Sequence, residues 1–302
     1  AVILVVSATG GVEVGTEIAW KKLRDTGMPT MIFVSRMDRE HADYDGTMAQ
    51  IRSALGIRCA AANLPIGTEH DFSGVVDILG DVSGDMKDAA ESALDSLAEA
   101  VADTDDELME KFLDGGTLTS DEIRKGLHED VRTGSVVPVF VGSSYTSGGI
   151  PQLLDAIVSY FPSPAEAPPS KATKGDAEIE LAADAAGPLA ALVFKTSADP
   201  FVGKLSYFRV ISGTMTANSE VVDSRTHDTE RVAQLFVPLG KHQENVPRLV
   251  AGDIGVVGKL AHAITGDTLT TKADGIVLPG VDFPVPVFKV AVLPKSKADL
   301  EK

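Results

Sequence analysis

Cysteine, aromatic residues and long apolar runs are scarce in this sequence of 302 residues. The single cysteine, Cys59, cannot form a disulfide within the chain, which fits a reducing compartment and predicts a cytoplasmic protein. Aromatic residues make up only 5%, too few to suggest a base-stacking platform for single-stranded nucleic acid. No apolar run approaches the ~20 residues that a membrane helix needs, so the sequence predicts no membrane partner.

Positive charge is also scarce, and it is unevenly placed. The formal net charge is −17, yet residues 188–302 hold 13 Lys and Arg against 12 Asp and Glu, so the negative charge lies almost wholly in residues 1–187. Residues 77–130 are especially acidic, with 17 acids against 4 bases. They form either a solvated helical face or a docking surface for a basic partner. The acidic half argues against DNA as a partner, whereas the near-neutral half can contact RNA.

The two ends of the sequence break off inside structural patterns. Residues 1–6 form an apolar strand pattern that lacks both an initiator methionine and the basic region of a signal peptide. Residues 296–302 stop as a helix pattern begins. We therefore expect the sequence to be part of a longer protein.

Strand and helix patterns alternate in the first 161 residues. Apolar runs typical of buried parallel strands occur at 2–6, 31–34 and 136–141, and helix patterns occur at 16–25, 43–55 and 150–161. This order predicts a doubly wound α/β domain over residues 1–161. Residues 70–135 interrupt it with two acidic helix patterns, the first broken near 103–105 and the second opened by the capping box Thr119–Glu122. We interpret 70–135 as a helical insertion.

The remaining sequence changes character twice. Residues 162–187 are rich in proline, alanine and serine and predict a linker. Short strand patterns of period two, separated by turn residues, predict an all-β antiparallel barrel over 188–280. A further strand pattern at 285–292 predicts the start of a third unit over 281–302. The expected architecture is thus multi-domain: a doubly wound α/β portion with a helical insertion, followed by the barrel.

Two of the buried strand patterns end in residues that can bind a ligand. The strand pattern at 31–34 runs into Ser35-Arg36-Met37-Asp38, and the one at 136–141 runs into Gly142-Ser143-Ser144. Ligands of doubly wound domains bind at the carboxyl ends of strands, where these residues are expected. The pair resembles the guanine-reading half of a GTP-binding domain, whose signatures read Asn-Lys-x-Asp and Ser-Ala. Asp38 and Ser143 match outright.

The chemistry of guanine fits these residue types. Guanine presents two adjacent donors, N1–H and the exocyclic amine, which the two oxygens of the Asp38 carboxylate can accept together. Arg36 can lie on the purine face, and the backbone N–H of Ser144 can donate to guanine O6. Ser35 stands where the signature has asparagine, and its hydroxyl is shorter and has one donor. The alternative interpretation is a plain strand-to-loop turn in which Asp38 caps a backbone amide.

Other candidate sites lack the residues that their chemistry needs. Gly10-Gly11 is not followed by Gly-Lys-Ser/Thr, so we interpret it as a turn and not as a phosphate loop. The six histidines are scattered without partners at ligand spacing, and the sequence predicts no metal site. The basic residues of the predicted barrel form either a solvated surface or an RNA-contacting face; they are Lys204, Arg209, Arg225, Arg231, Lys241 and Arg248.

Over its whole length the sequence resembles the elongation factor G family of translational GTPases. The matching phrases include Gly11-Val12-Glu13, Met37-Asp38-Arg39-Glu40, Phe72-Ser73-Gly74-Val75-Val76-Asp77, Gly187-Pro188-Leu189 and Ile264-Thr265-Gly266-Asp267-Thr268-Leu269. Ser35-Arg36 departs from the family's Asn-Lys, and Phe236-Val237-Pro238-Leu239-Gly240-Lys241 is more similar to elongation factor G-like paralogues. We expect such a paralogue.

The resemblance implies the second half of a GTP-binding domain, then domain II and the start of domain III. It implies GTP and GDP as ligands, bound by Ser35, Arg36, Asp38, Ser143 and Ser144, and the ribosome as partner. It places the phosphate loop, the first switch, the catalytic histidine and the Mg²⁺ site before Ala1, so Mg²⁺ and GTP hydrolysis are expected only in the intact parent. The alternative is a ribosome-binding protein whose nucleotide pocket has degenerated. Whether the parent translocates, recycles or rescues ribosomes stays open.

Overall fold

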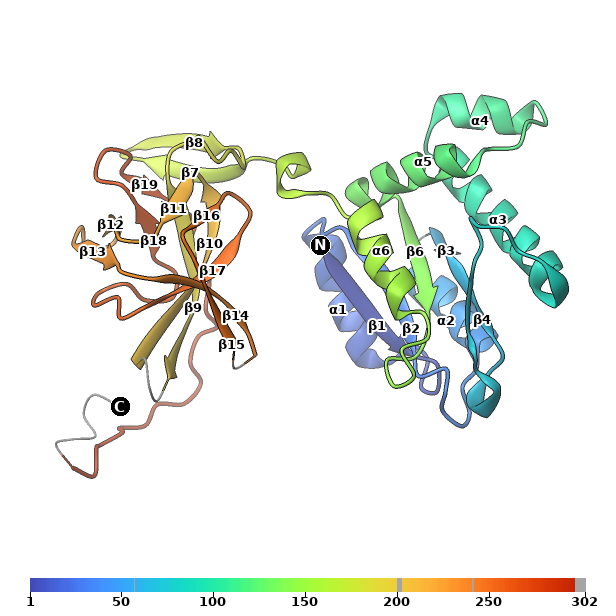
Figure 1. The fold of residues 1–302 in the computed structure, drawn as a ribbon, viewed down its shortest axis with the longest axis horizontal. Helices are drawn as coiled ribbons and strands as arrows, with labels where there is room; N and C mark the ends of the chain where they lie inside the picture. Colours follow the sequence, from blue (N-terminus) through green and yellow to red (C-terminus); the bar gives the residue numbers. More distant parts are fainter. Residues whose placement is uncertain (57, 200–202, 241, 297–302) are drawn as a thin grey trace. The chain divides into compact units, whose positions relative to one another are not determined.

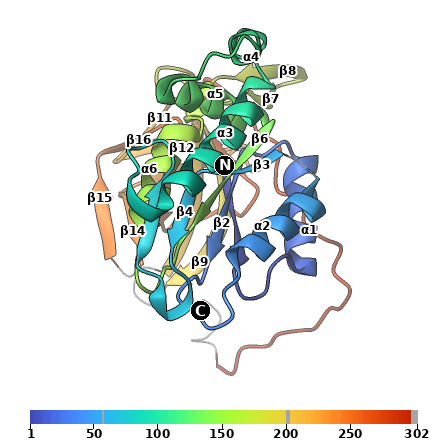
Figure 2. The same cartoon turned by 90° about the vertical axis from the view of Figure 1, so that its right-hand side faces the viewer.

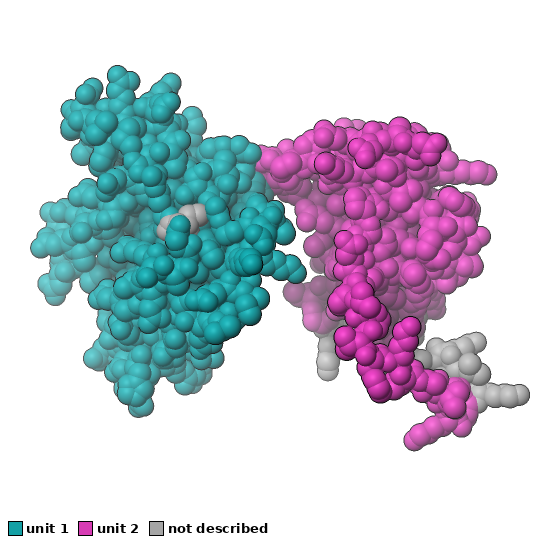
Figure 3. Space-filling model, turned by 180° about the vertical axis from the view of Figure 1, so that it is seen from behind, with its two compact units in different colours: residues 1–162 teal, residues 163–302 magenta. Residues whose placement is uncertain are grey.

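The computed structural model describes residues 1–56, 58–199, 203–240 and 242–296 (Figure 1). They divide into two compact units, Ala1–Pro162 and Ser163–Lys302, which Figure 3 colours separately and which are described here one at a time. Within the described residues, no helix has the length and apolar character needed to cross a membrane.

Unit 1, residues 1–162, is built on a parallel sheet with strand order β1-β2-β6-β3. These strands are β1 (Val2–Ser7), β2 (Thr30–Ser35), β6 (Val136–Val141) and β3 (Arg58–Ala61). The described α-helices are α1 (Val14–Asp25), α2 (Tyr44–Leu55), α3 (Lys87–Ala102), α4 (Asp106–Leu113), α5 (Ser120–Thr133) and α6 (Ile150–Tyr160). Helices α1 and α2 cover one side of the sheet, and α3, α5 and α6 cover the other (Figure 2). The predicted doubly wound α/β portion is confirmed.

Local sequence signals set the helix boundaries. The Asp43 side chain accepts from the Gly46 N–H at 2.9 Å and caps α2, which Gly56 ends with a φ of 58° in the left-handed region. The predicted capping box at the start of α5 is present, since Thr119 and Glu122 each bond the other's backbone N–H. The predicted break near 103–105 is also confirmed, because the Asp105 side chain caps a new helix there.

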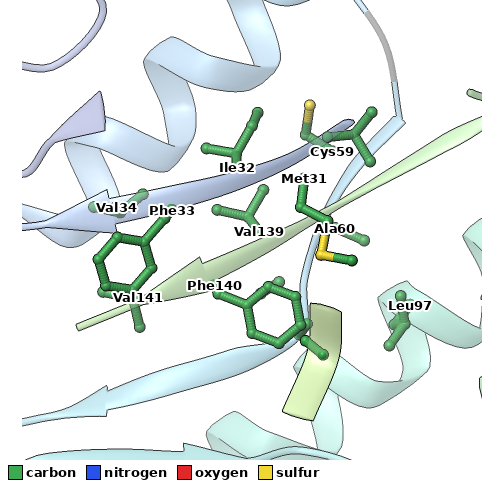
Figure 4. Close-up of a cluster of buried hydrophobic side chains, with 14 of the residues drawn as sticks. Met31, Ile32, Phe33, Val34, Cys59, Ala60, Leu97, Val139, Phe140 and Val141 are labelled. Atoms are coloured by element: carbon green, nitrogen blue, oxygen red, sulfur yellow. The ribbon is translucent and has the colours of Figure 1, made fainter. Parts of the chain in front are cut away.

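The core of unit 1 surrounds its two central strands. Every residue of β6 is buried, as are the first five of β2. Figure 4 shows their side chains gathered around the sheet with Cys59 of β3 and Leu97 of α3. Strand β1 differs from the prediction of burial on both faces, because Val5 is 58% exposed. Among the described strands β1 pairs only with β2, so it is an edge strand with one face incompletely covered.

The predicted insertion contains a hairpin strand and three helices. Strand β4 (Asn63–Ile66) pairs with β5 (Gly74–Asp77), and α3, α4 and α5 follow before the chain returns to the central strand β6. Asp130 of α5 lies beneath the α3–α4 break, is only 3% exposed, and has one carboxylate oxygen without a hydrogen-bond partner. Burial raises the pKa of Asp130 to about 6, against a smaller opposing effect of a hydrogen bond with Thr104.

We expect Asp130→Asn to stabilise unit 1 above neutral pH. A carboxyl whose pKa is raised by folding favours the fold when protonated, so its contribution is fully present below about pH 4 and is lost as the pH rises through about 6. The amide should therefore raise the free energy of unfolding by about 2 kcal/mol above pH 7 and flatten its pH dependence. Denaturant unfolding followed by the helix signal in circular dichroism measures this, because the described α-helices all lie in unit 1.

Asp95→Asn is the matched control, since Asp95 is an exposed carboxylate on α3. It should leave both the stability and its pH profile unchanged. A loss of stability in Asp130→Asn above pH 7 would show instead that the ionised Asp130 carboxylate stabilises the insertion.

Unit 2 contains a strongly curled antiparallel sheet with strand order β13-β12-β18-β9-β10-β17-β14-β15. Its strands are β9 (Ala190–Asp199), β10 (Gly203–Ser212), β12 (Ser219–Asp223), β13 (Thr229–Val232), β14 (Leu235–Leu239), β15 (His242–Val246), β17 (Ile254–Gly258) and β18 (Thr268–Thr270). A further pair, β11 (Thr214–Thr216) and β16 (Arg248–Val250), forms a separate two-stranded antiparallel sheet. Register shifts in the β9–β10 pair mark bulges, which bend a sheet. The predicted all-β barrel is confirmed.

The structure departs from the sequence predictions at both ends of unit 2. Where a linker is predicted, β7 (Ser170–Lys174) and β8 (Ala177–Leu181) form a hairpin beside β19 (Ile276–Val277). The hairpin is ordered because Ala172 and Leu181 are buried against residues 276 and 278, about a hundred positions later. Residues 285–292, where a strand is predicted, do not form one. No described segment lies beside them as a hydrogen-bonded partner, which a strand needs. Residues 297–302 of the predicted third unit lie outside the described residues.

Candidate functional site

The two candidate loops meet at the carboxyl edge of the parallel sheet. Strands β2 and β6 are neighbours, and their pairing ends at Val34 and Val141. Beyond it, the Gly142 N–H donates to the Val34 carbonyl at 2.9 Å, and the Met37 N–H donates to the Gly142 carbonyl at 3.4 Å. The backbone itself therefore holds residues 36–38 against residues 142–144.

Asp38 and Ser143 are in direct contact. The Ser143 hydroxyl donates to Asp38 Oδ1 at 2.5 Å and accepts from the N–H groups of Tyr145 and Thr146, at 3.2 and 3.3 Å. Ser143 is fully buried, and the Asp38 side chain is 11% exposed. The serine thus fixes the carboxylate of one loop to the backbone of the other.

The residues before Asp38 face in different directions. The Ser35 hydroxyl donates to the Val6 carbonyl of β1 at 3.3 Å, so it ties two strands together and does not enter the loop contact. Arg36 is exposed and has a φ of 67°, a conformation that costs a non-glycine residue roughly 1 kcal/mol or more. Met37 is completely buried and anchors the turn from inside. The guanidinium of Arg36 consequently lies at the surface, while Asp38 turns back to Ser143.

Ser144 and Tyr145 form the outer part of the second loop. Both are exposed, and Tyr145 is 79% exposed. The structure therefore brings Asp38, Ser143 and Ser144 to one place, leaves Arg36 at its rim, and directs Ser35 toward β1.

Two supporting residues were not predicted from the sequence. The Asn63 side chain is buried and bonds both backbone groups of Val141, accepting from its N–H at 2.7 Å and donating to its carbonyl at 3.3 Å. Glu69 donates its N–H to the Met37 carbonyl at 2.8 Å, and its carboxylate accepts from the His41 N–H at 2.6 Å. In the sequence, the position of Asn63 directly after three alanines is a local signal, whereas no local pattern marks Glu69.

The arrangement suits a flat ligand that carries hydrogen-bond donors. It presents a carboxylate held by a hydrogen bond, an exposed Arg36 side chain and an exposed aromatic ring at Tyr145. Across the described ranges, no group of three or more His, Cys, Asp or Glu residues is arranged to hold a metal ion.

Comparisons with known proteins identify the family of this chain. Residues 1–163 match the family model of the elongation factor Tu GTP binding domain, and residues 188–272 match that of elongation factor G domain 2. A solved structure from Thermus thermophilus is similar, with a TM-score of 0.77 and 29% sequence identity. That match covers 97% of this chain but 44% of the Thermus chain, so this chain spans less than half of its length. The chain belongs to the elongation factor G family of translational GTPases.

Proposed function

We propose that this chain supplies the guanine-reading part of the nucleotide site in a ribosome-associated translational GTPase. The intact parent uses GTP binding and hydrolysis to drive translocation or a related ribosomal step. The observation that carries the proposal is the contact between Asp38 and Ser143 at the ends of β2 and β6. It places a fixed carboxylate where doubly wound domains bind their ligands.

Asp38 is the residue that selects guanine. Its carboxylate has acceptors only, and guanine offers it two adjacent donors. Ser143 restricts the rotation of the carboxylate by bonding Oδ1. A base without those donors cannot hydrogen-bond to the largely buried carboxylate and presents it with mismatched groups, which costs several kcal/mol.

Three neighbours complete the proposed base site. Arg36 lies on the purine face, and the backbone N–H of Ser144 donates to guanine O6. Ser35 contributes only indirectly, by joining β2 to β1 through the Val6 carbonyl.

The Ser35 hydrogen bond favours a second candidate function, because a hydroxyl engaged with β1 is not available to brace a phosphate loop. In that case the parent binds ribosomes through a degenerate nucleotide pocket.

In this proposal basic residues of unit 2 contact ribosomal RNA, but not all of the candidates that the sequence analysis gives. Arg225 donates to both oxygens of the buried Asp267, at 2.9 and 3.0 Å, and to the His262 carbonyl. It is therefore structural. Arg209, Arg231 and Arg248 are exposed and remain candidates, while Lys241 lies outside the described residues. Mg²⁺ and the catalytic step are assigned to the intact parent.

Titration of the full-length protein with labelled GDP, at fixed Mg²⁺ and with ATP as competitor, tests the proposal. We expect saturable binding that ATP displaces at least about a hundredfold less well than GDP, because adenine cannot satisfy Asp38. Absence of GDP binding in a folded full-length protein would replace the proposal by the ribosome-binding alternative.

A further inference from the structure

Arg39 lies across the mouth of the proposed base site. Its Nε is 3.5 Å from Asp38 Oδ2, and its guanidinium carbon is 5.2 Å from the centroid of the Tyr145 ring. Both contacts are made to residues that Ser143 holds, since Ser143 bonds Asp38 Oδ1 and the Tyr145 N–H. One side chain thus bridges the two loops on the open side of the carboxylate.

The guanidinium resembles a guanine base in the features that this site can sense. It is flat, it presents N–H donors at its edge, and its face lies on an aromatic ring. A carboxylate that is 11% exposed is stabilised by a nearby positive charge when no base is bound. A base that donates to Asp38 Oδ2 and lies between the loops needs the space and the acceptor that Arg39 occupies.

We propose that Arg39 sets the nucleotide affinity of this site by competing with the base for Asp38 and Tyr145, as a latch that must open before guanine binds. The inference rests on the proposed guanine site. The Arg39 side chain is 59% exposed, and exposed ion pairs and cation–π contacts are individually weak. The latch therefore opens readily. The apparent affinity for the nucleotide equals the affinity of the open site multiplied by the fraction of time that the latch is open.

Such a latch affects the association and dissociation rate constants of nucleotide binding differently. Rotamer changes of exposed side chains take picoseconds to nanoseconds, far faster than nucleotide association. The closed state then lowers the association rate constant and leaves the dissociation rate constant unchanged. A residue that merely supported the fold of the loop would change dissociation as well.

Arg39→Gln in the full-length protein, with labelled GDP in equilibrium and stopped-flow experiments, tests the proposal. We expect the dissociation constant for GDP to fall about fivefold, equal to about 1 kcal/mol, and the gain to lie in the association rate constant. Arg36→Gln is the matched control and should weaken GDP binding about threefold, because Arg36 lies on the purine face. Both variants remove one positive charge from the same loop, so a general charge effect would move them in the same direction.

A double-mutant cycle tests the contact with the ring. In a Tyr145→Ala background the latch loses one of its two partners, so Arg39→Gln should improve GDP binding less than in the wild type. Equal gains in both backgrounds would overturn the role given to Tyr145.

The outcomes separate this proposal from the one on which it rests. If the wild type binds GDP selectively and Arg39→Gln binds it equally or more weakly, with an unchanged thermal unfolding midpoint, the latch is wrong and the guanine site stands. If the wild type binds GDP selectively and Arg39→Gln binds it more tightly through a faster association, both proposals are supported. If neither protein binds GDP, both fall.

Discussion

Replacing Asp38 by asparagine is expected to weaken GDP binding by the full-length protein about a hundredfold and to create binding of XDP, the xanthine nucleotide. The amide oxygen of the new side chain can still accept from the Ser143 hydroxyl, so the loop contact survives the substitution. The second atom changes from an acceptor to an NH₂ donor, which opposes the guanine amine and suits the carbonyl that xanthine has in its place. A mismatched, mostly buried polar pair costs about 3 kcal/mol, equal to the hundredfold loss.

Competition of GDP and XDP for a labelled nucleotide measures this exchange of preference. Asp45→Asn serves as the control, because Asp45 is an exposed carboxylate on α2 and its loss should leave both affinities unchanged. Unaltered affinity of the Asp38 variant for both nucleotides would mean that Asp38 does not read the base.

Gly142→Ala is expected to lower the free energy of unfolding of unit 1 by about 2–3 kcal/mol and to weaken GDP binding at least about tenfold. A Cβ atom on residue 142 would lie 2.3 Å from the carbonyl oxygen of Gly148 and 3.2 Å from both the Gly149 Cα and the Phe33 ring. The nearest obstacle is backbone, which cannot rotate away as a flexible side chain does. The loop must therefore shift, and Ser143 moves with it away from Asp38.

Denaturant unfolding and GDP titration of the same variant test both parts of this expectation. Gly15→Ala in α1 is the matched control, because apart from its chain neighbours and the backbone of its own helix no atom lies within 4 Å of its added Cβ. Alanine in a helix should stabilise unit 1 by about 0.5–1 kcal/mol. Wild-type stability together with wild-type GDP affinity in Gly142→Ala would show that close packing of these glycines does not position the loop.

Much of this arrangement could be predicted from the sequence, because the signals that produce it are local. The apolar runs of β2 and β6 specify buried parallel strands, and the caps at Asp43 and Thr119 begin their helices where expected. The meeting of Asp38 with Ser143 followed from the same patterns, since parallel strands end at one edge of a sheet.

The rest depends on partners that are distant in the sequence. Asn63 bonds Val141, 78 residues away, and the Arg39–Tyr145 contact joins two loops that no periodicity relates. The β7–β8 hairpin has too few apolar residues to reveal itself, because much of its core comes from residues 276 and 278. Composition predicts a linker in such a segment whenever the covering residues come much later in the chain.

The separation between Asp38 and Ser143 also has a consequence for synthesis of the protein. Their hydrogen bond joins residues 105 positions apart, and most of the intervening chain is the acidic insertion. At about 5–20 residues per second, a ribosome needs roughly 5–20 s to make that interval. Through this time β2 lacks its central neighbour β6, and the carboxylate has no serine to orient it. In a nascent chain the proposed base site is thus complete only after the whole insertion and the strand behind it have left the ribosome.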